Sequence, residues 1–459
     1  MNIVLLSGGS GKRLWPLSND IRSKQFIKLF KDSDGNYESM VQRVYRQITS
    51  VDPNANITIA TGKSQVSAIR NQLSSDVGVC IEPCRRDTFP AIVLAAAYLV
   101  DELGVGLDEA VAVCPVDPYV EDRYYEGIRR LVDLASGKNS NASNLTLMGI
   151  EPTYPSDKYG YIIPETTDNV SKVIEFKEKP DVETAGKYLD RGALWNAGVF
   201  AFKLGYLIDK AHEMIDFTDY RDLYAKYESL QKISFDYAVV ENETSISVMR
   251  YAGEWRDVGT WNMMCEVMSD VTKGNAILDD KCSNTNIINE LDIPVICMGC
   301  NDMVVAVSCD GILVSDKQRS GHLKKYVEKI DEDARFAEKS WGTYTVMDAQ
   351  PGSMTVKIEL LNGNGMKYHS HELRDEVWTI IAGTGTAIVD GMEQAVKPGD
   401  VISIAAGCKH TIIAKENMNI IEVQIGTEIS VKDKKIYSLT RVQPESENSG
   451  AYAMRYTER

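Results

Sequence analysis

Basic residues follow a glycine-rich turn at the start of this sequence. An apolar run at residues 3–6 leads into the glycine-rich stretch 7–11. Lys12 and Arg13 come directly after this stretch. Glycine has no Cβ, so such a turn lets backbone N–H groups approach an anion closely, and adjacent cations would hold the charge of the anion. Further cations follow at Arg22, Lys24 and Lys28. This chemistry predicts a binding loop for a nucleoside triphosphate.

The glycine spacing differs from that of two common phosphate-binding motifs. Gly8, Gly9 and Gly11 do not fit GxxxxGK[ST], and no acidic residue follows at the place that the dinucleotide-binding GxGxxG unit requires. A glycine-rich turn after a strand is often only a turn, so a plain strand–turn–helix unit is the alternative interpretation.

Composition argues against several classes of partner. The chain has 459 residues, with 66 acidic and 50 basic side chains and a formal net charge of −16. This charge disfavours nucleic acid and anionic membrane surfaces as partners. The longest apolar run, residues 91–100, is about half of a membrane span, and the first residues do not read as a signal peptide. Nine cysteines without framework spacing predict reduced thiols and a cytoplasmic protein. Cys297 and Cys300 form a CxxC whose apolar neighbours favour buried strand thiols over a zinc or redox site.

The elements that would position the glycine turn alternate along residues 1 to about 135. Short β-branched runs predict strands at 57–60, 77–81 and 111–114, and longer patterns predict helices at 65–73 and 91–102. Such alternation predicts right-handed βαβ units and a mostly parallel sheet covered on both faces. Ligands of this architecture bind at the carboxyl ends of the strands.

The order of strand, GGSGKR, LWPLS and SKQF resembles the signature of the sugar-phosphate nucleotidylyltransferases, and most closely that of the mannose-1-phosphate guanylyltransferases. Ser23 stands where that family usually has proline. The resemblance implies transfer of GMP from GTP to mannose 1-phosphate with release of pyrophosphate, and it gives Arg13 and Lys24 the catalytic task of holding the phosphates. The nucleotide-binding residues that it implies are Leu6, Gly8, Gly9, Gly11, Lys12, Arg13, Arg86 and Thr88.

Arg86 and Thr88 lie in residues 82–92, EPCRRDTFPAI, which are similar to the family pattern EPxxRNTAPAI. Asp87 and Phe89 depart from that pattern. The resemblance implies a contact between this loop and the nucleotide. A simpler interpretation is a loop that caps the following apolar helix.

Two distant aspartates are candidates for a magnesium site. Asp117 follows a predicted strand and matches the aspartate of the family's P-x-D-H, with Pro118 in place of the histidine. Asp257 matches the family's W-x-D-V-G-[ST]-W. Mg²⁺ binds through one or two carboxylates together with substrate phosphates. We therefore expect the two aspartates to converge, with catalytic roles for both.

Sugar-binding candidates lie between the two aspartates. Gly160 could let backbone approach a hexose, and Glu178 and Lys179 match the family's F-x-E-K-P. Asn196 matches W-N-[AS]-G-[IMV]-F, and Asp236 matches I-D-Y-A-[VL]-M-E. The resemblance implies that Lys179 holds the phosphate of the sugar while the carboxylates and the amide accept hydrogen bonds from its hydroxyls.

A β-rich middle segment follows at residues 274–335. It resembles the family's middle region, which packs against a partner subunit, so a homo-oligomer (a dimer) is expected. Residues 317–329 predict a charged helix that is a linker or has a solvated face.

From residue 336 the chain resembles the cupin domain of type II phosphomannose isomerases. Trp341-Gly342-Thr343-Tyr344 opens it, and short alternating strands predict an antiparallel barrel. A His-x-His pair on a strand points both rings to one face. The predicted ligands of Zn²⁺ or another divalent metal are His369, His371, Glu376 and His410.

The cupin departs from the isomerase pattern in several places. Glu372 and Leu373 are extra residues, Ala405 and Ala414 replace proline and asparagine, and the D-R-Y-G-R ending is absent. No base for an aldose–ketose isomerisation stands out.

The predicted fold is α/β. A Rossmann-like nucleotidyltransferase domain at residues 1–273 precedes the middle segment at 274–335 and an antiparallel β-barrel cupin with a polar tail at 336–459. The predicted function is GDP-mannose synthesis from GTP and mannose 1-phosphate with Mg²⁺, and the cupin would also interconvert fructose 6-phosphate and mannose 6-phosphate. The alternative is another nucleotide and sugar 1-phosphate pair, with a cupin that only binds a ligand or oligomerises.

Overall fold

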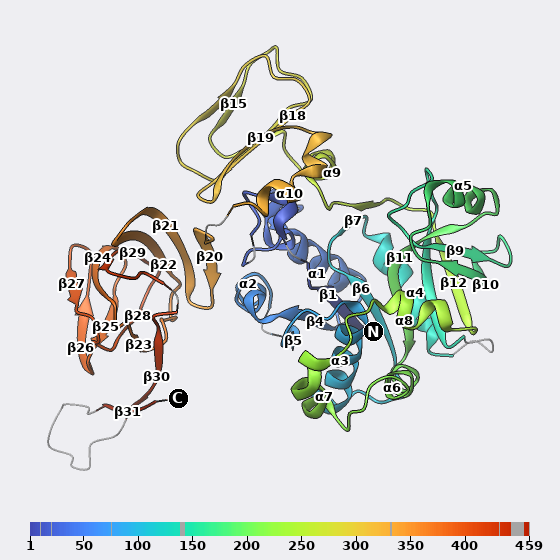
Figure 1. Cartoon of the computed structure of the whole chain (residues 1–459), viewed down its shortest axis with the longest axis horizontal. Coiled ribbons are helices and arrows are strands. Elements are labelled where there is room, and N and C mark those ends of the chain that lie inside the picture. The colour runs from blue at the N-terminus through green and yellow to red at the C-terminus, as the bar shows by residue number, and fades with distance from the viewer. Residues whose placement is uncertain are drawn as a thin grey trace.

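The computed structural model describes residues 1–9, 11–19, 21–74, 76–137, 143–330, 333–430, 432–441 and 454–458. Its elements form three groups, which Figure 1 shows in blue to green, in yellow, and in orange to red. The predicted boundaries at residues 273 and 335 stay predictions. Most of the polar tail, residues 442–453 and 459, lies outside the described residues.

Within the described residues, one large sheet dominates the first group. Its strands, in spatial order, are β5 (Gly78–Glu82), β4 (Asn56–Gly62), β1 (Asn2–Ser7), β6 (Ala110–Pro115), β11 (Leu194–Lys203), β8 (Leu145–Ile150), β12 (Ile246–Tyr251), β10 (Val170–Lys177) and β9 (Tyr161–Pro164). The first four strands are parallel, as the alternation predicts. From β11 onward the sheet is mixed, because only the β8–β12 pair is parallel there. The parallel half carries the glycine turn at its carboxyl edge.

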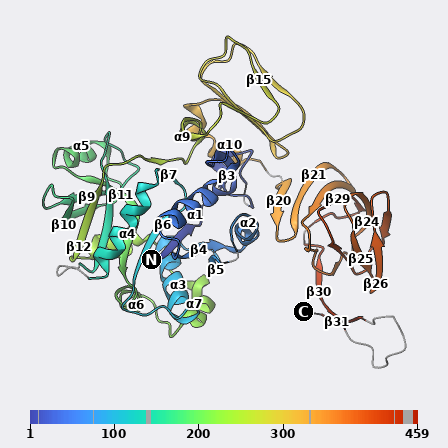
Figure 2. The ribbon, with the colours of Figure 1, turned by 180° about the vertical axis from the view of Figure 1, so that it is seen from behind.

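Helices cover both faces of this sheet, which Figure 2 shows from behind. The helices of the first group are α1 (Met40–Val51), α2 (Val66–Gln72), α3 (Thr88–Asp101), α4 (Arg123–Ala135), α5 (Val182–Asp190), α6 (Leu204–His212), α7 (Tyr220–Lys226), α8 (Phe235–Ala238) and α9 (Trp261–Val267). Ile3 and Leu5 of β1 pack with α1 and α4, whereas Val4 packs with α3 on the other face. This two-sided burial explains why β1 is a continuous apolar run.

Local capping sets the ends of two helices near the glycine turn. Ser39 and Gln42 form a reciprocal capping box at the start of α1. Helix α3 begins at Thr88, three residues before the predicted start, because the side chain of Asp87 accepts the N–H of Thr88 at 2.9 Å. Asp87 has a positive φ of 70°.

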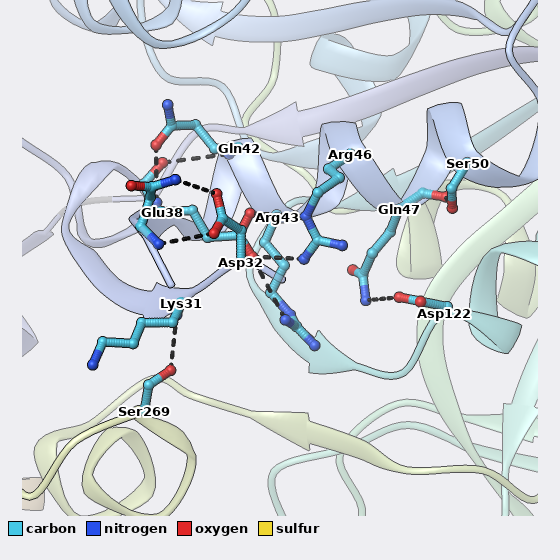
Figure 3. Close-up of polar contacts among 12 residues, drawn as sticks. Lys31, Asp32, Glu38, Gln42, Arg43, Arg46, Gln47, Ser50, Asp122 and Ser269 are labelled. Carbon is cyan, nitrogen blue, oxygen red and sulfur yellow. Dashed lines mark hydrogen bonds and ion pairs between the residues drawn. The ribbon is translucent and has the colours of Figure 1, made fainter. Parts of the chain in front are cut away.

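Polar contacts join α1 and the β2–β3 hairpin to neighbouring parts of the chain (Figure 3). Arg46 donates to Glu38 of β3 (Tyr37–Ser39) at 2.7 Å, and Gln47 donates to Asp122 at 2.9 Å. The N–H of Lys31, at the end of β2 (Lys28–Lys31), donates to Ser269 Oγ at 2.8 Å. The β2–β3 hairpin is thereby joined to the chain that leads into the middle segment.

The middle segment is a stack of short strands. Strands β14 (Thr272–Lys273), β16 (Asn286–Asn289) and β18 (Met303–Ser308) are parallel, as are β15 (Ala276–Leu278) and β17 (Val295–Cys297), and β19 (Gly311–Asp316) is antiparallel to β18. Buried Ile287, Val305 and Val307 fill its interior. Cys297 is buried at the end of β17, and Cys300 is half-buried in the next turn.

The predicted charged helix at 317–329 is shorter and more irregular than expected, but its charged face is largely solvated. The chain forms a 3-10 turn at Arg319–His322 and one helical turn at α10 (Lys324–Val327). Lys317 is only 9% exposed and donates to Asn284 Oδ1 at 2.7 Å, and Val327 is buried. Lys317, Ser320 and Val327 thus face the protein, while the other charged side chains of the segment are exposed.

Two sheets form the cupin barrel. One contains β20 (Phe336–Lys339), β21 (Gly342–Gln350), β22 (Ser353–Leu360), β29 (Met418–Gly426), β24 (Arg374–Ala382) and β27 (Val401–Ile404). The other contains β26 (Met392–Val396), β25 (Gly385–Val389), β28 (His410–Ala414), β23 (His369–Ser370), β30 (Lys435–Arg441) and β31 (Met454–Glu458). All pairings recorded in both sheets are antiparallel, as predicted.

The cupin contacts the first group through β20 and α2. Asn71 donates to the backbone oxygen of Lys339 at 2.8 Å, and Gln72 donates to Glu338 at 3.2 Å.

Candidate functional site

Buried polar side chains form hydrogen bonds that fix the glycine turn after β1. Ser23 Oγ donates to the backbone oxygen of Gly9 at 3.1 Å, and Gln65 Nε2 donates to Ser23 Oγ at 2.7 Å. Gln25 Nε2 donates to Ser7 Oγ at 2.9 Å. These contacts fix the start of the N-terminal loop (residues 8–26) on the carboxyl edge of the parallel strands.

The two predicted magnesium ligands lie on neighbouring strands. Strand β13 (Trp255–Asp257) pairs with β7 (Pro118–Val120), and Asp257 lies opposite Pro118. Asp257 is therefore adjacent to Asp117, although 140 positions separate them in the sequence. This pairing brings the two carboxylates together.

The two predicted phosphate-binding cations reach the same place. Lys24 Nζ lies 2.8 Å from Asp117 Oδ2. A Cβ at Gly259 would lie 3.2 Å from Asp257 Oδ1 and 3.7 Å from Arg13 Nη1, so Arg13 borders Asp257. Arg13, Lys24, Asp117 and Asp257 thus form one cluster at the edge of the sheet.

The pKa shifts of the two aspartates follow from this arrangement. Burial raises the pKa of Asp117, but the charges of Lys24 and Arg13 outweigh burial and hold the pKa below its ordinary value. Burial also raises the pKa of Asp257, and the adjacent Asp117 carboxylate adds to this against the opposing effect of Lys24. Two close carboxylates, of which one is reluctant to ionise, suit a divalent cation such as Mg²⁺.

The five predicted sugar-binding residues also form one cluster. Asn196 Nδ2 donates to Asp236 Oδ1 at 2.7 Å, and the N–H of Asn196 donates to the backbone oxygen of Gly160 at 2.8 Å. Lys179 Nζ contacts Glu178 Oε1, and Glu178 is buried beside Gly160. Burial and the Glu178 carboxylate raise the pKa of Asp236 to about 6. The cluster offers several oxygen acceptors and one exposed cation to a ligand.

The sugar cluster and the phosphate cluster lie beside each other. Strands β6 and β11 are antiparallel neighbours in which Phe200 is opposite Val113. A Cβ at Gly198 would lie 3.9 Å from Pro115, so the chain beyond these residues brings Asn196 level with Asp117. An acceptor and a phosphate donor could therefore meet between them.

The loop of Arg86 and Thr88 contacts the chain that carries Asp236. Thr88 Oγ1 accepts the N–H of Phe235 at 2.8 Å, and the Arg86 guanidinium donates to the backbone oxygen of Glu228. These contacts connect the loop to residues 228–235, which directly precede Asp236. The predicted contact between the loop and the nucleotide base stays a prediction.

Two other residues that are predicted to contact the nucleotide, Leu6 and Lys12, lie outside the phosphate cluster. Leu6 is half-buried in β1, opposite Ala60 and Pro115. Lys12 lines a cavity of about 210 Å³ together with Trp15 and Arg335, so its side chain borders the linker to the cupin.

The predicted metal ligands of the cupin are brought together inside its barrel. Their ligand atoms lie within 4.8 Å of one another and all four residues are buried: His369, His371, Glu376 and His410. His369 lies opposite His410 on paired strands β23 and β28. This His/Glu cluster could hold a metal ion.

Hydrogen bonds orient the three imidazoles of this cluster. Nδ1 of His369 contacts the backbone oxygen of Lys367 at 2.6 Å, Nδ1 of His410 contacts that of Cys408 at 3.0 Å, and Nδ1 of His371 contacts that of Asp433. A carbonyl only accepts, so each Nδ1 carries the proton and each Nε2 lone pair is available for a metal. Burial lowers the pKa of His369 to about 2, which keeps this ring neutral.

The donor set fits a divalent cation. Glu376 Oε2 and His410 Nε2 are buried and have no hydrogen-bond partner in the described part of the chain, although they lie 3.2 Å apart. A cation between them would satisfy both atoms. Burial opposes ionisation of Glu376, but Arg374 Nε lies 3.2 Å from Glu376 Oε1, and its charge favours the ionised carboxylate and so lowers the pKa of Glu376. Arg374 Nη2 also lies 3.0 Å from His371 Nε2, so a cation would compete with this guanidinium.

The His/Glu cluster opens into a cavity of about 660 Å³. Cationic side chains on its wall include Lys339, Arg374 and Lys434. The wall also contains Ile21, which belongs to the N-terminal loop of the first group. Burial and Glu376 raise the pKa of Glu422, on the same wall, to about 7.

Sequence reasoning missed Gln65 and Glu422. Gln65 carries no chemical signature, and its contact with Ser23 spans 42 positions. Glu422 could have been found from alternation, because Met418, Ile420 and Gln424 of the same strand are buried with it.

A match to a family model covers most of the first group. The model described as nucleotidyl transferase matches residues 2–274, which is more than half of the chain. The chain belongs to the nucleotidyl transferase family. A second model, described as cupin domain, matches residues 356–423.

Curated relatives of this family member span almost the whole chain. The mannose-1-phosphate guanylyltransferase ManC of Salmonella typhimurium strain LT2 is 28% identical over 473 residues, which cover 94% of this chain and 96% of that protein. The alginate biosynthesis protein AlgA of Pseudomonas aeruginosa strain PAO1 is 27% identical, and the match covers 94% of this chain and 95% of that protein. A crystal structure named as mannose-1-phosphate geranyltransferase from Thermus thermophilus matches with a TM-score of 0.60 and 26% identity. That match covers 72% of this chain and 99% of the other.

None of the helices in the described ranges is long and apolar enough to cross a membrane.

Proposed function

We propose that this nucleotidyl transferase catalyses the transfer of GMP from GTP to mannose 1-phosphate, which yields GDP-mannose and pyrophosphate. The observation that carries the proposal is the convergence of Arg13, Lys24, Asp117 and Asp257 beside the Asn196–Asp236 pair. The name of the relative ManC, a mannose-1-phosphate guanylyltransferase that matches over 94% of this chain, points to the same substrates.

The reaction needs little covalent chemistry from the protein. A phosphate oxygen of mannose 1-phosphate attacks the α-phosphorus of GTP in line, and pyrophosphate leaves. Arg13 and Lys24 neutralise the charge of the triphosphate, and the backbone of Gly8, Gly9 and Gly11 offers N–H donors. Asp117 and Asp257 would hold Mg²⁺, which supplies charge neutralisation at the phosphates when bound.

The sugar cluster positions the attacking phosphate. The Lys179 ammonium would exchange its contact with Glu178 for one with this phosphate. Glu178, Asn196 and Asp236 would accept hydrogen bonds from the hexose hydroxyls. Holding both reactants in one orientation is the main contribution to rate in this type of transfer.

Substrate identity is tested with a matrix of nucleotides and sugar 1-phosphates. The full chain with Mg²⁺ is assayed for pyrophosphate release with GTP, dTTP, UTP or CTP, each combined with mannose 1-phosphate or glucose 1-phosphate. We expect the highest kcat/KM for GTP with mannose 1-phosphate. A faster reaction of another pair would replace this assignment, and no release with any pair would refute nucleotidyl transfer.

The cupin supports a second proposed activity, the interconversion of fructose 6-phosphate and mannose 6-phosphate. Its support is the His/Glu cluster, which suits Zn²⁺ or another divalent metal, at the bottom of a cavity lined by cations that suit a phosphate. Those ligands would hold the metal, and its chemistry would be polarisation of the sugar carbonyl. The alternative is a cupin that only binds a ligand or oligomerises the chain.

Isomerase activity of the full chain separates these alternatives. The metal-loaded protein is assayed with fructose 6-phosphate beside a His410→Ala variant. Conversion by the wild type and its loss in the variant would support catalysis, whereas no conversion with any divalent metal would favour the binding role. A dimer and a cytoplasmic location stay predictions, the first of which light scattering can test.

A further inference from the structure

The stretch Asn19–Lys24 has one side in the phosphate cluster. Ser23 Oγ donates to the backbone oxygen of Gly9 at 3.1 Å, and Lys24 Nζ lies 2.8 Å from Asp117. These two residues place the end of the N-terminal loop against the glycine turn and the aspartates.

The other side of this stretch is bound to the middle segment. Arg22 makes two hydrogen bonds to the carboxylate of Glu290, with Nη1 at 2.7 Å and Nη2 at 2.9 Å. Its guanidinium also lies over the ring of Phe336, 5.0 Å from the centroid. Figure 1 shows the middle strands beside this N-terminal part of the chain. A bidentate pair with a stacked guanidinium fixes both distance and orientation.

Asn19 ties the backbone at Ile21 and Arg22 to the middle segment. Its Oδ1 accepts the N–H groups of Ile21 at 2.8 Å and Arg22 at 2.7 Å, and its own N–H donates to the backbone oxygen of Arg22 at 2.9 Å. Asn19 Nδ2 donates to Asp310 Oδ2 at 2.7 Å, which adds a second contact to the middle segment. These contacts couple the position of Arg22 to that of Asn19 and Asp310.

We propose that Arg22 is a positioning residue for nucleotidyl transfer, which acts through Lys24 by anchoring the N-terminal loop to Glu290. Only Ser23 separates Arg22 from Lys24, so a displaced guanidinium changes where Lys24 Nζ meets the triphosphate. The inference rests on the proposed role of Lys24 in the transfer. It makes the middle segment part of the catalytic unit.

A double-mutant cycle tests this inference. The kcat of pyrophosphate release from GTP and mannose 1-phosphate is measured for the wild type, Arg22→Lys, Lys24→Ala and the double variant. Lysine keeps the charge but cannot make the bidentate contact. We expect Arg22→Lys to lower kcat about tenfold in the wild type, because small misplacements of a phosphate-holding group are costly, and less than about twofold in the Lys24→Ala background.

Two further variants guard against a simple loss of folding. Glu290→Gln removes the partner charge from the other side and should show the same non-additivity with Lys24→Ala. Arg250→Lys is the matched control, because Arg250 is 16% exposed against 11% for Arg22 and pairs with Glu151 at 3.0 Å outside the phosphate cluster. Its kcat should equal that of the wild type, and its melting temperature should match that of Arg22→Lys.

The outcomes are distinguishable. Equal losses from Arg22→Lys in both backgrounds, or no loss in either, would overturn the positioning role while the transfer activity itself stands. Full activity of Lys24→Ala would also overturn it, since Arg22 would have nothing to position. Absence of transfer by the wild type would instead refute the proposed function.

Discussion

Gly160 offers a sharp test of the sugar cluster. A Cβ at this position would lie 2.5 Å from Glu178 Oε2, 3.2 Å from Phe176 Cζ and 3.3 Å from Asn196 Cβ. The first distance is shorter than any non-bonded contact of a Cβ atom. Gly160→Ala must therefore displace the Glu178 carboxylate, which we assign to the hexose. Overpacking of this kind costs about 1–3 kcal/mol. If that cost falls on sugar binding, KM for mannose 1-phosphate rises about 5- to 150-fold.

Initial rates at saturating GTP measure this effect, and rates at saturating mannose 1-phosphate give KM for GTP, which should stay unchanged. Gly186→Ala in α5 is the matched control, because nothing lies within 4 Å of a Cβ there. Alanine should stabilise that helix by up to ~1 kcal/mol and leave both KM values alone. An unchanged KM for mannose 1-phosphate in a folded Gly160→Ala protein would refute the placement of the sugar, and equal losses for both substrates would point to a general disruption.

Three other measurements follow from the site. Asp257→Asn should lower Mg²⁺-dependent kcat at least about tenfold and raise the Mg²⁺ concentration for half-maximal rate, because one of two carboxylate ligands is lost; an unchanged Mg²⁺ titration would contradict this. The pKa of Asp236 is raised to about 6 from 3.8, so the native state keeps a proton that the unfolded state has already released, and stability falls as pH rises across this interval. Urea unfolding should show that the free energy of unfolding falls by this contribution, on the order of 2–3 kcal/mol, between about pH 4 and pH 6 in the wild type but not in Asp236→Asn. His410→Ala should lose the bound divalent metal after dialysis, measured by metal analysis, while guanylyl transfer continues; retained metal would argue against the His/Glu cluster.

Much of the sheet could be predicted because strands that are buried on both faces appear in the sequence as short apolar runs. Residues 57–60 and 111–114 are short β-branched runs that become β4 and β6, flanked by helices on both faces. The meeting of Asp117 and Asp257 could be expected from strand ends and motifs, but the β7–β13 pairing that produces it has no local signal. It joins residues 118–120 to 255–257, and three-residue strands carry almost no periodicity.

Lys317 shows that charge alone does not decide the exposure of a single side chain, although the other charged residues of 317–329 are exposed. Lys317 is buried because its amine reaches Asn284 Oδ1, a contact that depends on how the middle strands stack. A lysine can bury its aliphatic stem when its ammonium finds an oxygen, and the sequence does not reveal that partner. Helix α3 begins before the predicted apolar run because Asp87 accepts the N–H of Thr88, and buried Phe89 and Pro90 belong to its first turn.

The contacts of the N-terminal loop depend on the whole chain. Arg22 and Glu290 are 268 positions apart, and Ile21 reaches a cavity whose other walls come from residues 333–434. Neither partner could be found by pattern, because nothing in a run of basic residues tells which cation binds phosphate and which binds protein. Lys24 and Arg22 differ only in the surface that each meets after the three groups dock.

This docking explains how an acidic chain can keep cations at a phosphate site. Lys24 is paired with Asp117, Lys179 with Glu178, and Arg22 with Glu290, so each of these positive side chains already has a carboxylate partner. The first two pairs lie in the substrate clusters, where each lysine meets its carboxylate through one ammonium that can bind a phosphate instead. The Arg22 guanidinium makes two hydrogen bonds to Glu290 and stacks on Phe336, so it keeps its partner while the others change theirs. The geometry of the contacts, rather than charge or burial, therefore separates the cations that can bind substrate from the one that holds the loop.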